Sequence, residues 1–128
     1  MPPSERGDYK RQLGGRGEEI AAVYLLQQGY AILERNWRCP AGEVDIVARE
    51  GETLVFVEVR TRRGDRFGSA EESITRAKQA RLVELAQTFL QEKRLADQNW
   101  RIDVMAIELD PNGRVKRLNL IRNAVGGE

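Results

Sequence analysis

The chain has 128 residues, of which 41% are hydrophobic and 32% charged, a composition typical of one globular domain with a charged surface. It contains one cysteine and no histidine, which excludes an internal disulfide, a cysteine-rich zinc site and every catalytic scheme that needs histidine. Carboxylates, lysine, arginine and metals that prefer oxygen ligands remain. No apolar run reaches the roughly 20 residues of a membrane-spanning helix, so we expect a cytoplasmic protein that binds no membrane.

The first part of the chain is polar and glycine-bearing. Residues 1–13 are expected to form a loose arm, followed by a single domain over residues 14–122 and a frayed end over residues 123–128. Apolar residues at helical spacing predict a first helix over Glu18–Gln28, which Gly29 ends.

The rest of the chain is predicted to form five strands and one more helix. A strand at Tyr30–Arg38 leads into an apolar hairpin at Gly42–Arg62, and a long helix follows from Thr75, a good N-cap, to about Arg94. Two strands, at Trp100–Leu109 and Val115–Ile121, close the chain. The predicted order is α-β-β-β-α-β-β. A helix between the third and fourth strands permits a parallel crossover, so we expect an α/β fold with a mixed central β-sheet flanked by helices.

The hairpin carries acids where a plain hairpin would carry apolar side chains: Glu43, Asp45 and Glu58, followed by Arg60. A two-residue turn at Glu50-Gly51 would place Glu43 opposite Glu58. Asp45 and Glu58 would then be diagonal neighbours, roughly 7 Å apart at the backbone. Acids this close repel unless a cation lies between them. The pattern therefore favours a metal site for phosphodiester hydrolysis, in which Arg60 could orient water or offset negative charge.

Basic residues cluster along the chain although the net charge is only +1. Arg16 precedes the first helix, and Arg62, Arg63 and Arg66 directly follow the hairpin acids. Such clusters can hold a phosphate backbone, and one beside the hairpin would hold it near the predicted metal. An ordinary solvated surface is the alternative for each cluster.

Several short motifs occur together between about Gly14 and Ile121. They are Gly17-Glu18, Tyr24-Leu25, Gly29-Tyr30, Arg35-Asn36-Trp37-Arg38, Gly42-Glu43-Val44-Asp45, Val57-Glu58-Val59-Arg60, Phe67-Gly68, Lys78-Gln79 and Arg101-Ile102-Asp103-Val104. In combination they resemble the YraN-like family of bacterial proteins. That family is grouped with Holliday-junction-resolvase-type nucleases in the PD-(D/E)xK superfamily, so the resemblance implies a restriction-endonuclease-like fold.

The resemblance also implies a set of site residues. These are Asp45 and Glu58 as metal ligands, the backbone carbonyl of Val59 as a further ligand, Glu18 as a helix-borne acid, Gln79 as a polar neighbour and Glu43 as an extra acid. Glu43 would contact either a second ion or an arginine, and Glu18 is equally explained as an acid favoured by the helix dipole. The implied cofactor is Mg²⁺ or Mn²⁺. The implied partner is DNA, with branched or junction DNA among the candidates, and a homodimer is plausible on family grounds.

The sequence departs from the superfamily motif at one position, because Arg60 stands where a lysine is expected. Arginine cannot act as a general base, although it can bind phosphate and stabilise negative charge. Lys78, about one turn into the second long helix, could supply an amine instead, or could be an ordinary exposed lysine. Three functions stay open: a metal-dependent endonuclease, a nucleic-acid-binding module of the same fold without hydrolysis, and a structural or interaction domain.

Overall fold

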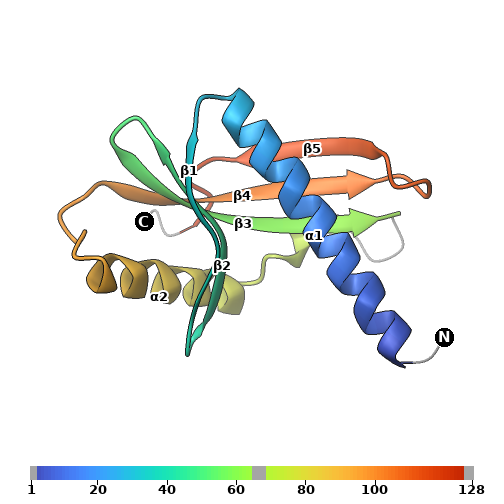
Figure 1. Cartoon of the computed structure of the whole chain (residues 1–128), viewed down its shortest axis with the longest axis horizontal. Helices are drawn as coiled ribbons and strands as arrows, with labels where there is room; N and C mark the ends of the chain where they lie inside the picture. Colours follow the sequence, from blue (N-terminus) through green and yellow to red (C-terminus); the bar gives the residue numbers. More distant parts are fainter. Residues whose placement is uncertain (1–2, 65–68, 126–128) are drawn as a thin grey trace.

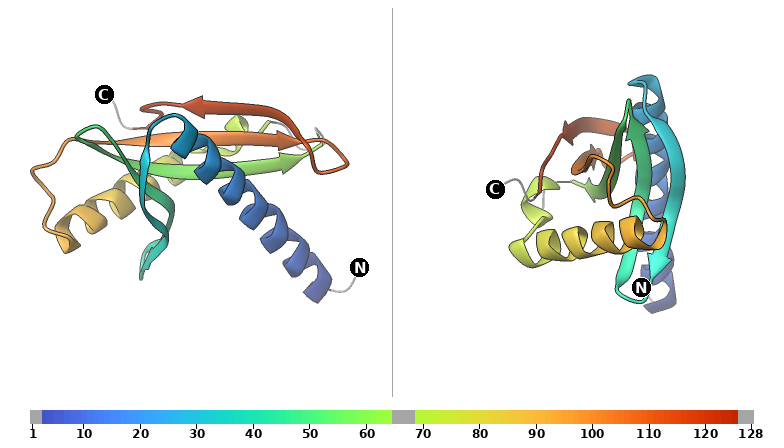
Figure 2. Two further views of the ribbon diagram at one scale, coloured as in Figure 1. Left: turned by 45° about the horizontal axis from the view of Figure 1, so that its top comes forward. Right: turned by 90° about the vertical axis from the view of Figure 1, so that its left-hand side faces the viewer.

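A five-stranded sheet in the order β1-β2-β3-β4-β5 forms the centre of the protein, with one long helix on each of its faces (Figures 1 and 2). The computed structural model describes residues 3–64 and 69–125, with side chains from residue 15 onward. The elements are α1 (Pro3–Gln27), β1 (Ala31–Cys39), β2 (Gly42–Glu50), β3 (Thr53–Arg63), the short 3-10 helix η1 (Glu71–Ser73), α2 (Arg76–Glu92), β4 (Trp100–Leu109) and β5 (Val115–Ile121). The predicted fold class and the order of long elements are confirmed.

Helix α1 begins at Pro3, much earlier than the predicted start at Glu18, so the segment expected to be a loose arm is helical over residues 3–13. Proline suits the first position of a helix, where its missing N–H needs no partner. The early turns of α1 extend beyond the sheet (Figure 1). A helix that projects past its core needs no apolar stripe, so periodicity could not reveal this part. Neither long helix in the described ranges is long and apolar enough to cross a membrane.

Helix α1 approaches the sheet most closely at Gly17. A Cβ atom added there would lie 1.9 Å from Oγ1 and 3.0 Å from Cβ of Thr61 on β3, so only glycine fits without movement. This contact places the next residue, Glu18, beside the strands that carry the other acids. The glycine in the Gly17-Glu18 motif therefore has a packing reason that sequence spacing alone does not reveal.

Two apolar layers hold the helices to the sheet. On the α2 side, Phe89 packs edge-on against Trp37 of β1 and Phe56 of β3, with ring centroids 5.2 and 5.5 Å away. On the α1 side, Ala21 and Leu25 pack against the opposite face of the strands. Burial on both faces explains why the central strands are nearly continuous apolar runs.

The β2–β3 turn differs from the prediction. Glu50 pairs with Thr53, so Gly51 and Glu52 form the turn, whereas a turn at Glu50-Gly51 was expected. Gly51 has φ of 59°, which glycine adopts at little cost in the first central position of a tight hairpin turn. The register therefore shifts by two residues, and continuing it one step beyond the last pair brings Asp45 level with Glu58.

Strands β2 and β3 separate near Asp45. The last β2–β3 pair on that side is Ile46 with Val57, whereas β2 stays paired with β1 as far as Gly42. Val44 and Val47 both pack in the α2-side layer, although strict alternation would place them on opposite faces. The strand therefore twists at Asp45, and the β1–β2 hairpin bends toward α2 (Figure 1).

The other end of the sheet is closed by β4 and β5. Strand β4 runs parallel to β3 and β5 antiparallel to β4, with α2 on the crossover as predicted. The residues after β5 do not fray as expected over their described part, because the Ala124 N–H donates to the Ile102 carbonyl at 2.8 Å and Val125 is buried. Residues 126–128, the rest of the predicted frayed end, lie outside the described ranges.

Candidate active site

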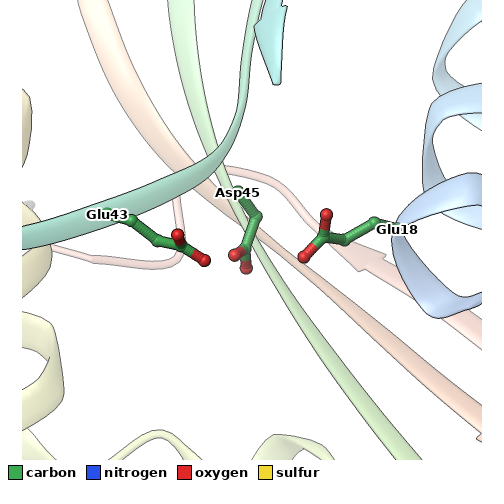
Figure 3. A group of neighbouring side chains, drawn as sticks. All are labelled: Glu18, Glu43 and Asp45. Carbon is green, nitrogen blue, oxygen red and sulfur yellow. The ribbon is translucent and has the colours of Figure 1, made fainter. Parts of the chain in front are cut away.

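Three acids from two separate elements meet where β2 leaves β3. Glu18 comes from α1, and Glu43 and Asp45 come from β2 (Figure 3). One carboxylate oxygen of each lies within 4.8 Å of the others. In Figure 3 the Asp45 side chain lies between the other two, and all three carboxylates point toward a common centre. This cluster could hold a metal ion.

Asp45 also contacts β3. Its carboxylate accepts a 2.8 Å hydrogen bond from the Val59 N–H. Burial, followed by the negative charge of Glu58, raises the pKa of Asp45 from 3.8 to about 8. Because the N–H and C=O of one strand residue face the same edge, the Val59 carbonyl also faces the gap beside Asp45. The structure thus brings Asp45, Glu58 and the Val59 backbone together, and their roles as metal ligands stay a prediction.

Glu18 has a polar neighbour that the sequence reasoning missed. Burial, then Asp45, raises the pKa of Glu18, whereas a hydrogen bond from the Asn36 side chain opposes the shift. Asn36 lies in the middle of β1 with φ of 55°, a conformation that asparagine tolerates better than most residues. In the β1–β2 register it falls between the Arg35–Ile46 and Trp37–Val44 pairs, level with Asp45. A polar, turn-favouring residue inside a strand was the available signal.

The remaining acids each have an arginine partner. Arg38 lies 2.8 Å from Glu43, but its side chain is 78% exposed, so this is a weak surface pair. Arg60 lies 3.3 Å from Glu58, and both side chains are largely buried. Among the residues that the structure describes, no salt bridge joins Glu18 or Asp45 to a cation. Glu18 and Asp45 thus differ from Glu43 and Glu58, whose charges are paired within the described part of the chain.

Arg60 is held by a second contact. Its Nε donates to Oγ of Ser73 at 2.8 Å, and that hydroxyl donates to the Ala70 carbonyl at 2.5 Å. Ser73 ends η1, which follows the segment after β3. This serine was also missed, because nothing in its local sequence connects it with the hairpin.

A pocket of about 180 Å³ opens beside the acids, between the β1–β2 hairpin and the start of α2. Its lining residues are Gly42, Glu43, Glu58, Arg60, Lys78, Arg81, Leu82 and Leu85. Lys78 therefore faces the hairpin, as its position one turn into the helix allowed. Gln79 lines neither this pocket nor the acid cluster, and its amide lies 3.5 Å from the Ile74 carbonyl.

Two of the arginines predicted to hold nucleic acid, Arg16 and Arg63, have hydrogen-bond partners within the chain. Arg16 donates two hydrogen bonds, of 2.6 and 3.0 Å, to the Gly113 carbonyl, and Arg63 donates to the Pro111 carbonyl. Both therefore hold the β4–β5 turn. Arg62 has a buried Nε with no hydrogen-bond partner among the described residues. Arg66 and the Phe67-Gly68 motif lie outside the described ranges.

Comparison with known proteins covers the part of the chain that carries the site. The model of a family described as "Uncharacterised protein family UPF0102" matches residues 17–107. A UPF0102 protein of Caldicellulosiruptor saccharolyticus is 47% identical over 115 residues, which is 90% of this chain and 98% of the relative. Another, from Roseiflexus castenholzii, is 55% identical over 101 residues, or 78% and 82% of the two chains. A third, from Chloroflexus aurantiacus, is 51% identical over 118 residues, or 91% and 95%.

Proposed function

The chain belongs to the uncharacterised protein family UPF0102, the YraN-like family that its motifs resemble, and we propose that it is a metal-dependent nuclease that hydrolyses phosphodiester bonds in DNA. One observation carries the proposal. Glu18, Glu43 and Asp45 bring carboxylate oxygens within 4.8 Å of one another where two strands separate, next to Glu58 and an open pocket. An acid of the first helix and two acids of β2 therefore meet beside an open pocket.

The donor atoms fit a divalent cation. All are oxygens, which suit Mg²⁺ or Mn²⁺, and no salt bridge joins Glu18 or Asp45 to a cation among the residues that the structure describes. Asp45, Glu58 and the Val59 carbonyl would hold the ion, with Glu18 on the opposite side and Glu43 at the rim. When bound, such an ion lowers the pKa of water and offsets charge on a phosphate. The raised pKa of Asp45 agrees with a buried acid that has several anionic neighbours and, among the described residues, one backbone N–H donor.

Hydrolysis would add one water across a phosphodiester bond. The water oxygen forms a new bond to phosphorus and the bond to the leaving oxygen breaks. One water proton goes to solvent, and the leaving oxygen takes up a proton from solvent. The chain contributes position: the Val59 N–H orients the Asp45 carboxylate, and Arg60 orients Glu58. Carboxylates fixed before substrate arrives need no rearrangement during the reaction.

The choice of DNA as substrate rests on the family resemblance. Arg16 and Arg63 add no support, because their observed hydrogen bonds go to a turn of the same chain. Action on branched DNA as a homodimer stays a prediction with the same basis.

A second candidate function is a nucleic-acid-binding module that has lost hydrolysis. The ion pair between Arg60 and Glu58 favours it, because a ligand committed to a guanidinium is less available to a metal. This function predicts salt-dependent DNA binding that survives Glu58→Gln and yields no product.

Cleavage assays test the proposal directly. Four-way junction, duplex and single-stranded DNA are incubated with the protein in Mg²⁺, Mn²⁺ or EDTA. We expect metal-dependent cleavage of at least one substrate, and a loss of about 10²-fold or more in Asp45→Asn. Asp97→Asn, the same substitution at an exposed loop position, is the matched control and should cleave like wild type. Wild type that leaves all three substrates intact and behaves like Asp45→Asn contradicts the proposal.

A further inference from the structure

Three cations line the pocket beside Glu58, and two of them are already engaged. Arg81 donates to the Ala41 carbonyl at 3.0 Å, which ties α2 to the hairpin loop. Arg60 donates to Ser73 Oγ at 2.8 Å and to Glu58 Oε2 at 3.3 Å, with only 23% of its side chain exposed. Both guanidinium groups are therefore anchored within the protein, Arg81 through one hydrogen bond and Arg60 through two.

The contact between Arg60 and Ser73 is stabilised by further hydrogen bonds to the short helix η1. Glu71, in the same short η1 as Ser73, accepts hydrogen bonds from Arg117 at 2.7 and 2.8 Å and from Asn119 at 2.8 Å. Arg117 also contacts Glu108 of β4. Strands β4 and β5 therefore hold η1 in place. Because η1 is fixed, Ser73 presents its hydroxyl at a set position and Arg60 is held against Glu58.

Lys78 differs from both arginines. It lines the same pocket from the first turn of α2, and its side chain is exposed. Its backbone N–H is capped by Thr75 Oγ1 at 3.2 Å, but its ammonium group makes no hydrogen bond or ion pair with any residue that the structure describes. A lysine ammonium has three donors on a flexible stem, so Lys78 can reach an anion that enters the pocket.

We propose that Lys78 contacts the phosphate group of the substrate in this pocket, and that Arg60 serves instead to position Glu58. The proposal rests on the function proposed above, and it assigns the substrate's phosphate to the space between the start of α2 and the hairpin. A phosphate beside Glu43 and Glu58 needs a cation that is free to neutralise it. Of the three cations that line the pocket, Lys78 is the one whose charged group makes no bond to any residue that the structure describes.

Paired charge-removal variants test this assignment. Lys78→Met removes the ammonium and keeps most of the side-chain volume. Arg76→Met removes a positive charge from the same exposed helix end but from a residue outside the pocket lining. At saturating DNA we expect Lys78→Met to lower the cleavage rate by about 10²-fold and Arg76→Met by less than about threefold. Both should melt at the wild-type temperature, because both side chains are exposed.

Acetylation of lysines, read by mass spectrometry, gives a second readout that does not need activity. Bound duplex DNA should protect Lys78 several-fold, whereas Lys93, paired with Glu34 at the other end of α2, stays reactive. Protection of Lys78 without any cleavage supports this inference and contradicts the nuclease function. Cleavage with Lys78 unprotected, or with equal losses in the two variants, overturns this inference and leaves the nuclease function standing. A protein that neither binds nor cleaves DNA overturns both.

Discussion

Two carboxylates in the sheet, Asp103 and Asp45, lie in opposite electrostatic surroundings. Asp103 is fully buried and accepts hydrogen bonds from the Tyr30 hydroxyl at 3.2 Å, Arg101 Nε at 2.9 Å and the Asn123 N–H at 2.9 Å. Among the residues that the structure describes, Asp45 accepts one backbone hydrogen bond, from the Val59 N–H, and the acids Glu18, Glu43 and Glu58 lie near it. Both sites are expensive to desolvate, but only that of Asp103 contains its own cation.

This difference separates a structural carboxylate from one suited to bind something else. At Asp103, the protein supplies every donor that the buried charge needs. At Asp45, burial and then the negative charge of Glu58 raise the pKa of the acid to about 8. Strongly shifted pKa values of this kind are typical of functional sites, where a bound ligand can neutralise the repulsion. Four substitutions test the comparison, in order of decreasing expected effect.

Asp103→Ala should destabilise the protein most. It leaves Arg101, the Tyr30 hydroxyl and the Asn123 N–H without their buried partner, and we expect a loss of about 3–5 kcal/mol in the free energy of unfolding. Urea denaturation measures the loss. Asp97→Ala, at an exposed position, is the control and should change little. A loss below about 1 kcal/mol would show that the Asp103 network is not structural.

Gly17→Ala should come next, with a loss of about 1–3 kcal/mol, because the new methyl group would overlap the Thr61 side chain. The same clash pushes α1 outward and moves Glu18 away from Asp45. Gly15→Ala is a matched control in the same helix, where an added Cβ meets nothing within 4 Å. It should instead stabilise the helix by up to about 1 kcal/mol. Equal effects in thermal melts would rule out close packing at Gly17.

Asp45→Asn should have the opposite sign to Asp103→Ala when no metal is present. The folded-state pKa of Asp45 is about 8, compared with 3.8 for an ordinary aspartate, so the unfolded chain loses its proton first. The stability contribution of this group is therefore full below about pH 3.8 and is lost as the pH rises through about 8. At pH 8 the variant should be more stable than wild type by at least about 1 kcal/mol.

Melting curves in EDTA across this pH range, repeated with Mg²⁺ or Mn²⁺, measure both halves of that prediction. A divalent cation should raise the melting temperature of wild type and not that of Asp45→Asn. A variant that is less stable than wild type at pH 8 in EDTA would indicate that Asp45 is a structural carboxylate like Asp103.

Glu71→Gln should have the smallest effect, which is present at neutral pH and disappears at acid pH. Hydrogen bonds from Arg117 and Asn119 lower the pKa of Glu71 from 4.5 to about 2. Its contribution is therefore present above about pH 4.5 and lost as the pH falls toward about 2. Acid titrations of wild type and variant should diverge above pH 4.5 and converge below about pH 2. Curves that stay parallel over the whole range would contradict the role of Glu71 in holding η1.

The order of the long elements and the central acid pair were predictable from the sequence, because both depend on local patterns. Apolar periodicity marked the strands and α2, and alternation in the hairpin placed Asp45 and Glu58 near each other. The predicted β2–β3 register was wrong because Glu50-Gly51 and Gly51-Glu52 are both plausible turns. The positive φ of Gly51 decides between them, and sequence spacing does not reveal it.

The hydrogen-bond partners of Arg16 and Arg63 could not be predicted from local sequence patterns either. The carbonyls that they contact belong to the β4–β5 turn, far along the chain. Asn36 and Ser73 were missed for the same reason, since their partners Glu18 and Arg60 come from other elements. The sequence reveals the chemical character of a polar side chain, but it does not reveal which residue that side chain will contact.

The sequence by itself determined the chemical class of the site, because without histidine and with a single cysteine only carboxylates, lysine, arginine and oxygen-binding metals remain. It also determined the layers of the fold, since periodic burial is written into the order of apolar residues. Only the tertiary structure decided which charges meet. It left Asp45 among acids, gave Asp103 its arginine, and engaged Arg60 while leaving the Lys78 ammonium without a described partner. Electrostatic interactions depend on distance in space, and distance along the chain does not report it.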